Sequence, residues 1–316
     1  MNEVNLTLCN KIELLSSEIN FKLKNRVPFL KKSIDRYGDK MILNAQDGAE
    51  FLIEKINSDQ PFLTGRFGMN ECTAATKFLH KKSFGGGYGS SLYQMCNGAG
   101  FFPSKEEYLD DYAKMVLPLY QELDLLCVMN VIGEDYIVKH YCHNTKLTVL
   151  RAIEPAVTQW TSELKDKKVL VVHPFEESIR NQYYNNRDKI YAGTEILPQF
   201  DLQTIKAVQT AAETFDSRFS NWFEALDYMT EQALKKDFDI ALLGCGAYGL
   251  PLGARMKQAG KKAIHMGGCL QLLFGIRGAR WDTREYMKPF INEYWTRPLE
   301  SETPEHAKKV ENACYW

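Results

Sequence analysis

Residues 237–282 read DFDIALLGCGAYGLPLGARMKQAGKKAIHMGGCLQLLFGIRGARWD, and they contain the clearest structural pattern of the chain. An apolar run at 240–243 leads directly into a glycine-rich turn at 244–249. A helix-like segment follows and then a second apolar run at 263–264. This order predicts a strand, a glycine turn, a helix and a parallel strand, the unit in which a helix N-terminus holds a phosphate group.

The glycines of this turn, Gly244, Gly246 and Gly249, fit the spacing GxGxxG. They permit a tight turn, close approach of backbone to a pyrophosphate, and close packing of helix on strand. A dinucleotide site also needs an acidic residue near the end of the second strand, but here that strand ends in His265 and the next carboxylate is Asp282. The motif therefore favours a nucleotide-linked ligand other than NAD(P), and no NAD is expected. A tight turn that binds nothing stays open as an alternative.

The composition is that of an ordinary globular protein, with 45% hydrophobic and 25% charged residues in a chain of 316. A net charge of −1 gives no global field that would attract nucleic acid. The eight cysteines include no CxxC pair, which favours reduced thiols. The chain has no signal-peptide pattern and no apolar segment of membrane-spanning length. We expect a cytoplasmic protein, with peripheral contact at the inner face of the membrane as an open alternative.

Strand-like and helix-like segments alternate along the chain, which predicts an α/β fold: a Rossmann-like, mostly parallel sheet flanked by helices. We assign residues 43–316 to this domain and residues 1–42 to an N-terminal helical extension. Strands are predicted at 61–67, 125–129, 146–153, 168–173, 195–200, 205–209, 240–243 and 263–264, and a glycine-rich loop at 83–103. The tail from Tyr286 is expected to pack back on the domain.

The N-terminal extension carries Leu and Ile at helical spacing over residues 5–36, with a break at Pro28. Such a helix could pack on the core, contact a second copy of the chain or lie on a membrane. Because Lys and Glu are mixed along it, core packing or a contact between copies is favoured over a membrane.

Polar residues gather after four of the predicted strands. Since ligands of open α/β sheets bind outside the carboxyl ends of the strands, we expect these residues to share one crevice. They are Gly65, Arg66, Gly68, Asn70 and Glu71; His173, Glu176, Glu177 and Arg180; Gly244, Gly246, Tyr248 and Gly249; and His265, Gly267, Gly268 and Gln271.

Each charged residue of this set also has a structural alternative. Arg66 beside glycines is suited to a diphosphate clamp, but it could equally pair with an acid. Glu71 could be catalytic or could merely favour a helix start. His173 and Glu176, three residues apart, could act together. Alternatively, His173 could be an ordinary histidine and Glu176 a charge in the first turn of a helix. His265 has the accessible backbone of Gly267 and Gly268 beside it.

Two of these segments resemble the GT-D class of bacterial glycosyltransferases. Residues 64–71, TGRFGMNE, resemble the family's RFGDGE segment, and residues 242–268 resemble its late strand–glycine–helix–strand segment. The chain is also similar to uncharacterised proteins of bacterial polysaccharide gene clusters, through HPFEE at 173–177, ILP at 196–198 and GIRGARWD at 275–282.

The resemblance implies a hexosyl or related transfer from a nucleotide-diphosphate sugar to a hydroxyl acceptor, in bacterial surface polysaccharide or glycoconjugate synthesis. The implied partners are the sugar nucleotide and a glycan or lipid-linked acceptor, with a homo-oligomer left open. The expected catalytic residues are Glu71, His173 and Glu176, with Glu71 first as general base. The remaining glycines and polar residues of the crevice, Tyr248 and His265 among them, are expected to bind the sugar nucleotide.

The resemblance further implies a divalent cation, Mn²⁺ or Mg²⁺, for which Glu71 and His265 are the candidate ligands. The chain departs from the family at two positions: Met69 stands where the family has the aspartate of its D-x-E motif, and Gly268 stands where its late histidine would fall. Arg66 and the helix end at 244–249 could instead stabilise the departing diphosphate without a metal. A non-catalytic nucleotide- or glycan-binding subunit and, less favoured, an NAD(P)-dependent oxidoreductase remain alternatives.

Overall fold

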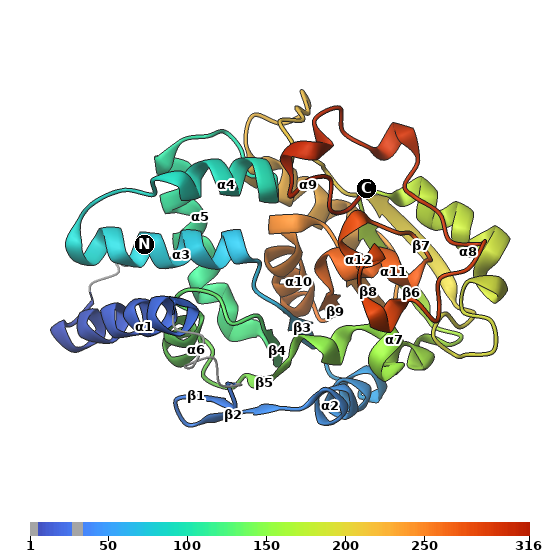
Figure 1. Cartoon of the computed structure of the whole chain (residues 1–316), viewed down its shortest axis with the longest axis horizontal. Helices are drawn as coiled ribbons and strands as arrows, with labels where there is room; N and C mark the ends of the chain where they lie inside the picture. The colour runs from blue at the N-terminus through green and yellow to red at the C-terminus, as the bar shows by residue number, and fades with distance from the viewer. Residues whose placement is uncertain (1–5, 27–33) are drawn as a thin grey trace.

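The computed structural model describes residues 6–26 and 34–316, and in this part of the chain helices cover both faces of a nine-stranded sheet (Figure 1). The strand order is β1-β2-β5-β4-β3-β9-β8-β6-β7, and every neighbouring pair is parallel except β1 with β2. The strands are β1 Arg36–Tyr37, β2 Lys40–Leu43, β3 Leu63–Gly65, β4 Leu125–Val128, β5 Lys146–Val149, β6 Lys168–His173, β7 Asp201–Lys206, β8 Ile240–Leu243 and β9 Lys262–His265.

Successive residues of the inner strands point to opposite faces, so each face has its own core. Leu126 and Leu243 pack with the helices of one face, whereas Leu125 and Leu242 pack with those of the other. The first face carries α3 Met69–Phe84, α4 Ser90–Ala99, α5 Glu106–Leu119, α6 Glu134–Tyr141, α9 Trp222–Leu234 and α10 Gly249–Gln258. The second carries α2 Ala45–Asn57, α7 Pro155–Thr158, α8 Glu176–Ile190, α11 Leu270–Leu273 and α12 Ala279–Asp282.

The chain changes direction across the sheet between β6 and β8. From β6 it passes through α8 on the second face to β7 at the sheet edge. From β8 it passes through α10 on the first face to β9, toward the centre. The segments that leave these two adjacent strands therefore diverge, and such a switch point leaves a crevice at the carboxyl ends of the strands.

The structure confirms the predicted parallel sheet and the unit at 240–265, in which β8, α10 and β9 follow one another. Three details of the prediction are wrong. The glycine-rich loop contains α4, which packs against α3 through apolar residues such as Met95. In place of the strands predicted at 195–200 and 205–209 there is the single strand β7 at Asp201–Lys206, all six residues of which pair with β6. Residues 36–43 form the hairpin of β1 and β2 around Gly38, whose φ of +60° suits glycine.

The N-terminal helix α1 spans Leu8–Arg26 and contacts α6, and the predicted break at Pro28 lies outside the described residues. Because β2 pairs with β5, the sheet extends into the segment assigned to the helical extension. The tail packs back as expected, for example through Trp295, whose Nε1 donates to the Ile190 carbonyl at 3.1 Å. In the described part of the chain, no helix combines the length and apolar character needed to span a bilayer.

Candidate functional site

Two adjoining cavities form one cleft along the carboxyl edge of the sheet. The smaller cavity lies at the switch point between β6 and β8, and its empty space, counted with the open solvent at its mouth, is about 680 Å³. The larger one runs past β3, β4 and β5, and its empty space counted in the same way is about 1460 Å³. We call them the switch-point cavity and the basic cavity. Both are lined by Arg66, Gly98, Ala99, Gly246, Gly268 and Tyr315, so these residues mark the junction.

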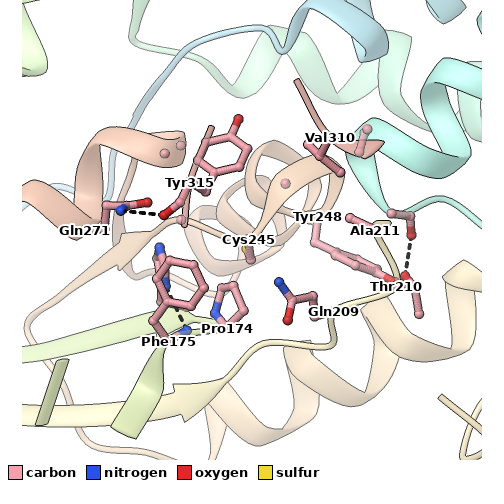
Figure 2. A pocket seen from close by; sticks show the side chains of 18 of the residues that line it. Pro174, Phe175, Gln209, Thr210, Ala211, Cys245, Tyr248, Gln271, Val310 and Tyr315 are labelled. Atoms are coloured by element: carbon pink, nitrogen blue, oxygen red, sulfur yellow. Dashed lines mark hydrogen bonds between the residues drawn. The ribbon is translucent and has the colours of Figure 1, made fainter. Parts of the chain in front are cut away.

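Apolar and aromatic side chains form most of the wall of the switch-point cavity (Figure 2). Pro174 and Phe175 follow β6, whereas Val310, Tyr315 and Trp316 come from the end of the chain. Phe175 and Trp316 meet edge to face, with ring centroids 6.1 Å apart. Such a wall suits the flat, partly apolar ring of a ligand.

Two polar atoms of this cavity are buried without a hydrogen-bond partner among the described residues. Gln271 is fully buried, and its Nε2 donates to the carbonyls of Ile276 at 3.2 Å and Tyr315 at 3.0 Å, but its Oε1 has no partner. The Tyr248 hydroxyl makes no hydrogen bond of good geometry but has the Thr210 side chain as a polar neighbour, and the Tyr248 ring stacks on Trp222 at 4.8 Å. Because buried polar atoms are rarely left unpaired, these two point to a ligand that supplies the missing hydrogen bonds.

His173 presents a hydrogen-bond donor to this cavity. Its Nδ1 accepts from the backbone N–H of Phe175 at 3.0 Å, which places the ring proton on Nε2. Burial lowers the pKa of His173 to about 3, so the ring is neutral. A neutral imidazole with its Nε2–H free can bind a ligand oxygen but cannot supply a positive charge.

The glycines after β8 make room for different neighbours. A Cβ on Gly244 would lie 2.5 Å from Cδ2 of His173, and Gly246 has a φ of +56° where the loop meets the end of α4. Both glycines line the cleft, but Gly249 does not. A Cβ on Gly249 would overlap the ring of His265. The third glycine of the motif therefore serves helix–strand packing.

His265 lies beneath the cleft and lines neither of its cavities. Its ring is packed beside Gly249 and Gly65, and its Nδ1 is buried without a partner among the described residues. Burial, with a smaller contribution from Arg66, lowers the pKa of His265 to about 3. The structure thus separates His265 and Gly65 from the cleft that the sequence predicted for them.

Arg66 stands at the junction of the two cavities. Its guanidinium packs on Gly267, where a Cβ would overlap it and where the φ of +62° also favours glycine. In the described chain it forms no ion pair within 4.0 Å, and its one protein contact of hydrogen-bond type is a weak one to the Phe67 carbonyl at 3.5 Å. A guanidinium held in place but left unpaired is suited to bind an anionic ligand.

Glu71 lines the basic cavity at the start of α3. Its carboxylate lies over the backbone of Gly68, where any Cβ would overlap it. Burial raises the pKa of Glu71, while Arg66 opposes this shift. Asn70 lines the same cavity, with its amide against Gly98. The segment 66–71 is therefore brought together as the sequence predicted.

The basic cavity holds a second carboxylate, which was not predicted from the sequence. Glu154 follows β5, and its Oε2 is buried without a partner in the described structure. Burial raises its pKa, whereas the neighbouring Tyr286 hydroxyl, Arg151 and Arg284 lower it. The sequence contained a signal for this residue, because Glu154 closely follows a predicted strand whose carboxyl end reaches the same edge of the sheet.

Basic side chains outnumber acidic ones around this cavity. Besides Arg66 it is lined by Arg151, Arg280 and Arg284, and its carboxylates are Glu71, Glu154 and Glu311. Arg280 is paired with Glu311. Glu311 is the first of three consecutive non-glycine residues with positive φ, at 311–313. This turn also carries the chain to Tyr315 at the junction. The three remaining arginines face two carboxylates, which favours an anionic ligand.

Glu176 is not part of the cleft. It begins α8, where its Oε1 accepts from the Thr204 hydroxyl at 2.6 Å, and it faces a separate cavity beside β7. His173 and Glu176 are close in sequence, but the chain turns between them at Pro174, so their side chains serve different surfaces.

The residues present do not fit the divalent cation that the resemblance implies. Glu71 lines the basic cavity, but His265 faces the backbone of Gly249 below it. In residues 6–26 and 34–316 no three His, Cys, Asp or Glu side chains come together as a ligand set. Glu71 and Glu154 line the same cavity but have no third His, Cys, Asp or Glu ligand beside them among the described residues, so no step of the chemistry is assigned to a metal.

Substitution of Gly267 by Ala is expected to displace Arg66 and weaken anion binding. Affinity for inorganic pyrophosphate should fall about tenfold or more, as in Arg66→Ala, because a charge-assisted hydrogen bond is lost. The double variant should be no weaker than Arg66→Ala alone. Gly260→Ala is the matched control, since Gly260 also has a positive φ (+80°) but open space around it. Isothermal titration calorimetry that finds equal losses for both glycine variants would contradict this role.

His265 is expected to make the stability of the protein sensitive to acid. Its pKa is about 3 in the folded chain against an ordinary 6.5, so its contribution is present above pH 6.5 and is lost as the pH falls toward 3. In His265→Asn, the slope of unfolding free energy against pH should decrease by about 1.4 kcal/mol per pH unit in this range. Urea unfolding at several pH values measures it. The exposed His306→Asn is the control, and an unchanged slope in His265→Asn would refute the assignment.

Comparison with known proteins gives a likeness of fold only. No family model and no curated protein matches the chain. One similar solved structure is described as the highly conserved domain of unknown function 1792, with a distinct glycosyltransferase fold; it has a TM-score of 0.46 and 12% identity, over 93% of this chain and 98% of that one. A selenomethionine-substituted structure of the same domain has a TM-score of 0.45 and 12% identity, over 94% and 98%.

Proposed function

We propose that this chain is a glycosyltransferase that moves a sugar from a nucleotide-diphosphate sugar to a hydroxyl acceptor. The observation that carries the proposal is the junction of the cleft, where an apolar cavity with unpaired buried polar atoms opens past Arg66 into a basic cavity. A sugar nucleotide has the same sequence of properties: a flat base, an anionic diphosphate and a polar sugar.

The nucleoside is placed in the switch-point cavity. Phe175, Tyr315 and Trp316 offer aromatic surface for the base. The free Oε1 of Gln271 can accept from an N–H of the base or a ribose hydroxyl, and the Nε2–H of His173 can donate to a ligand oxygen. His173 thus has a binding role in this proposal, since a neutral ring of such low pKa is a poor base at neutral pH.

The diphosphate is placed at the junction, against Arg66 and the backbone N–H groups around Gly246 and Gly268. As the bond between the sugar C1 and the phosphate oxygen breaks, negative charge builds up on the diphosphate. A guanidinium and oriented N–H groups in a sheltered cleft stabilise that charge.

The sugar and the acceptor occupy the basic cavity, where a carboxylate takes the proton of the acceptor hydroxyl. The acceptor oxygen then forms its bond to C1 while the diphosphate leaves with the electron pair. Glu71 is the first choice for this base because it lies next to Arg66 and hence to the reacting bond. Glu154 is the second, because its free Oε2 needs no rearrangement to accept a proton.

The wider setting follows from the resemblance of the sequence alone. We extend the proposal to a glycan or lipid-linked acceptor in bacterial surface polysaccharide or glycoconjugate synthesis. A binding subunit without turnover would use the same cleft, and it would differ only in the absence of transfer.

Ligand binding should raise the melting temperature of the protein by several degrees at saturating sugar nucleotide, because a ligand at a hundred times its Kd adds about 2.7 kcal/mol of stability. A thermal-shift panel of UDP-, GDP- and CMP-sugars and of NAD(P), each with and without Mn²⁺, measures this. One class of sugar nucleotide should give the shift, and Arg66→Ala should reduce it. No shift with any sugar nucleotide would overturn the proposal, and a shift with NAD(P) alone would replace it by an oxidoreductase.

Glu71→Gln should lower the rate of transfer by about a hundredfold or more, the typical contribution of a general base, with little change in nucleotide binding. Glu154→Gln is made in parallel. The exposed Glu285, which pairs with Lys288 and does not line the cleft, provides the control Glu285→Gln. Full transfer by Glu71→Gln together with loss in Glu154→Gln would move the base to Glu154. Nucleotide binding without transfer in the unmodified protein would instead identify a binding subunit.

A further inference from the structure

The N-terminal helix α1 carries a stripe of aliphatic side chains that no described residue covers. Leu8, Ile12, Ile19 and Leu23 are 75%, 56%, 53% and 48% exposed. Together with the partly exposed Leu15 they recur at intervals of three or four residues, which places them along one side of the helix. The 15 helical steps from Leu8 to Leu23 make this stripe about 22 Å long.

The opposite side of α1 is the one that packs on the protein. Leu14, Ser17 and Glu18 are buried there, and the helix lies beside α6 at the margin of the molecule (Figure 1). Ser17 is hydrogen-bonded to Asp135 at the start of α6. The helix is therefore held by one side, and its aliphatic stripe is not the side that contacts the core.

The acidic residues of α1 are used on the packed side. Glu13 pairs with Lys139 at 2.7 Å and contacts His140 at 2.8 Å, both on α6. Glu18 is buried, 3.8 Å from Lys22. In the helix as described, no carboxylate is left on the exposed side. The two carboxylates of α1 are thus turned toward the protein, whereas the basic residues near its end stay exposed.

The exposed charges of α1 are all positive and lie toward its end. Lys22 flanks the stripe and pairs with Glu18, whereas Lys24, seven residues after the buried Ser17, lies on the line of the packed side. Arg26 falls seven residues after Ile19, on the line of the stripe itself. Aliphatic residues along one side with Lys and Arg beside them are the pattern of helices that lie in the interface of an anionic bilayer.

We propose that the exposed side of α1 docks this protein on an anionic lipid surface. The aliphatic stripe enters the interface, and the basic residues lie at the level of the headgroups. A parallel pairing with the same helix of a second copy would bring the same positive charges together at one end. One helical stripe also falls well short of the roughly 800 Å² per partner of a stable protein interface. The inference is independent of the proposed activity.

The test is sedimentation of the full chain with phosphatidylcholine vesicles that contain or lack phosphatidylglycerol. We expect binding to the anionic vesicles only, weakened by salt because surface charges are screened. Ile12→Ser with Ile19→Ser should lower the partition coefficient about tenfold, because two aliphatic side chains no longer leave water. Lys22→Glu with Arg26→Glu should abolish the preference for anionic lipid.

The matched control is Phe215→Ser, which removes an apolar side chain that is 77% exposed elsewhere on the protein and should leave binding unchanged. Since all the substituted side chains are exposed, the variants are expected to fold, and their melting temperatures verify it. Failure of the unmodified chain to sediment with anionic vesicles, or binding unaffected by the double serine variant, overturns the proposal. A concentration-dependent dimer that the serine variant abolishes, without vesicle binding, would assign the stripe to a second copy.

Discussion

The parallel pairing of β6 with β8 is the constraint on which the rest of the site depends. The two strands are hydrogen-bonded neighbours, but the chain leaves them on opposite faces of the sheet. No connecting segment can cover the sheet edge between them, so a cavity remains at their carboxyl ends. His173 and Gly244 are the residues at which the strands meet this cavity. The end of α4 and residues 310–316 then enclose it.

The close packing of side chains against glycine backbone gives the cleft its shape. Gly244 accommodates His173, Gly267 accommodates Arg66 and Gly249 accommodates His265. The first two contacts position a donor and a cation at the surface of the cleft, whereas the third joins helix α10 to strand β9 below it. Glycines of one short region thus have two different purposes, binding and packing, and the difference lies in which side chain faces each of them.

The charges of the cleft are arranged along its length. The switch-point cavity holds neutral polar groups, because burial keeps His173 uncharged. The guanidinium of Arg66 stands at the junction, and the arginines and the carboxylates Glu71 and Glu154 lie beyond it. A ligand that is neutral at one end and anionic in the middle matches this order. In the proposed reaction, these carboxylates are the groups that would take the proton of the acceptor hydroxyl.

The parallel α/β sheet is predictable from the order of residues, since the apolar run at 240–243, the glycine turn and the run at 263–264 admit few other structures. The same order places Arg66, Glu71, Gly244 and Gly246 at one edge. The packing of side chains, in contrast, turns His265 below that edge, Glu176 toward β7 and Glu154 into the cleft. It also turns Glu13 and Glu18 of α1 toward the protein. The reason is geometric: strand periodicity predicts where a chain emerges from a sheet, whereas the direction of a side chain depends on the space its neighbours leave.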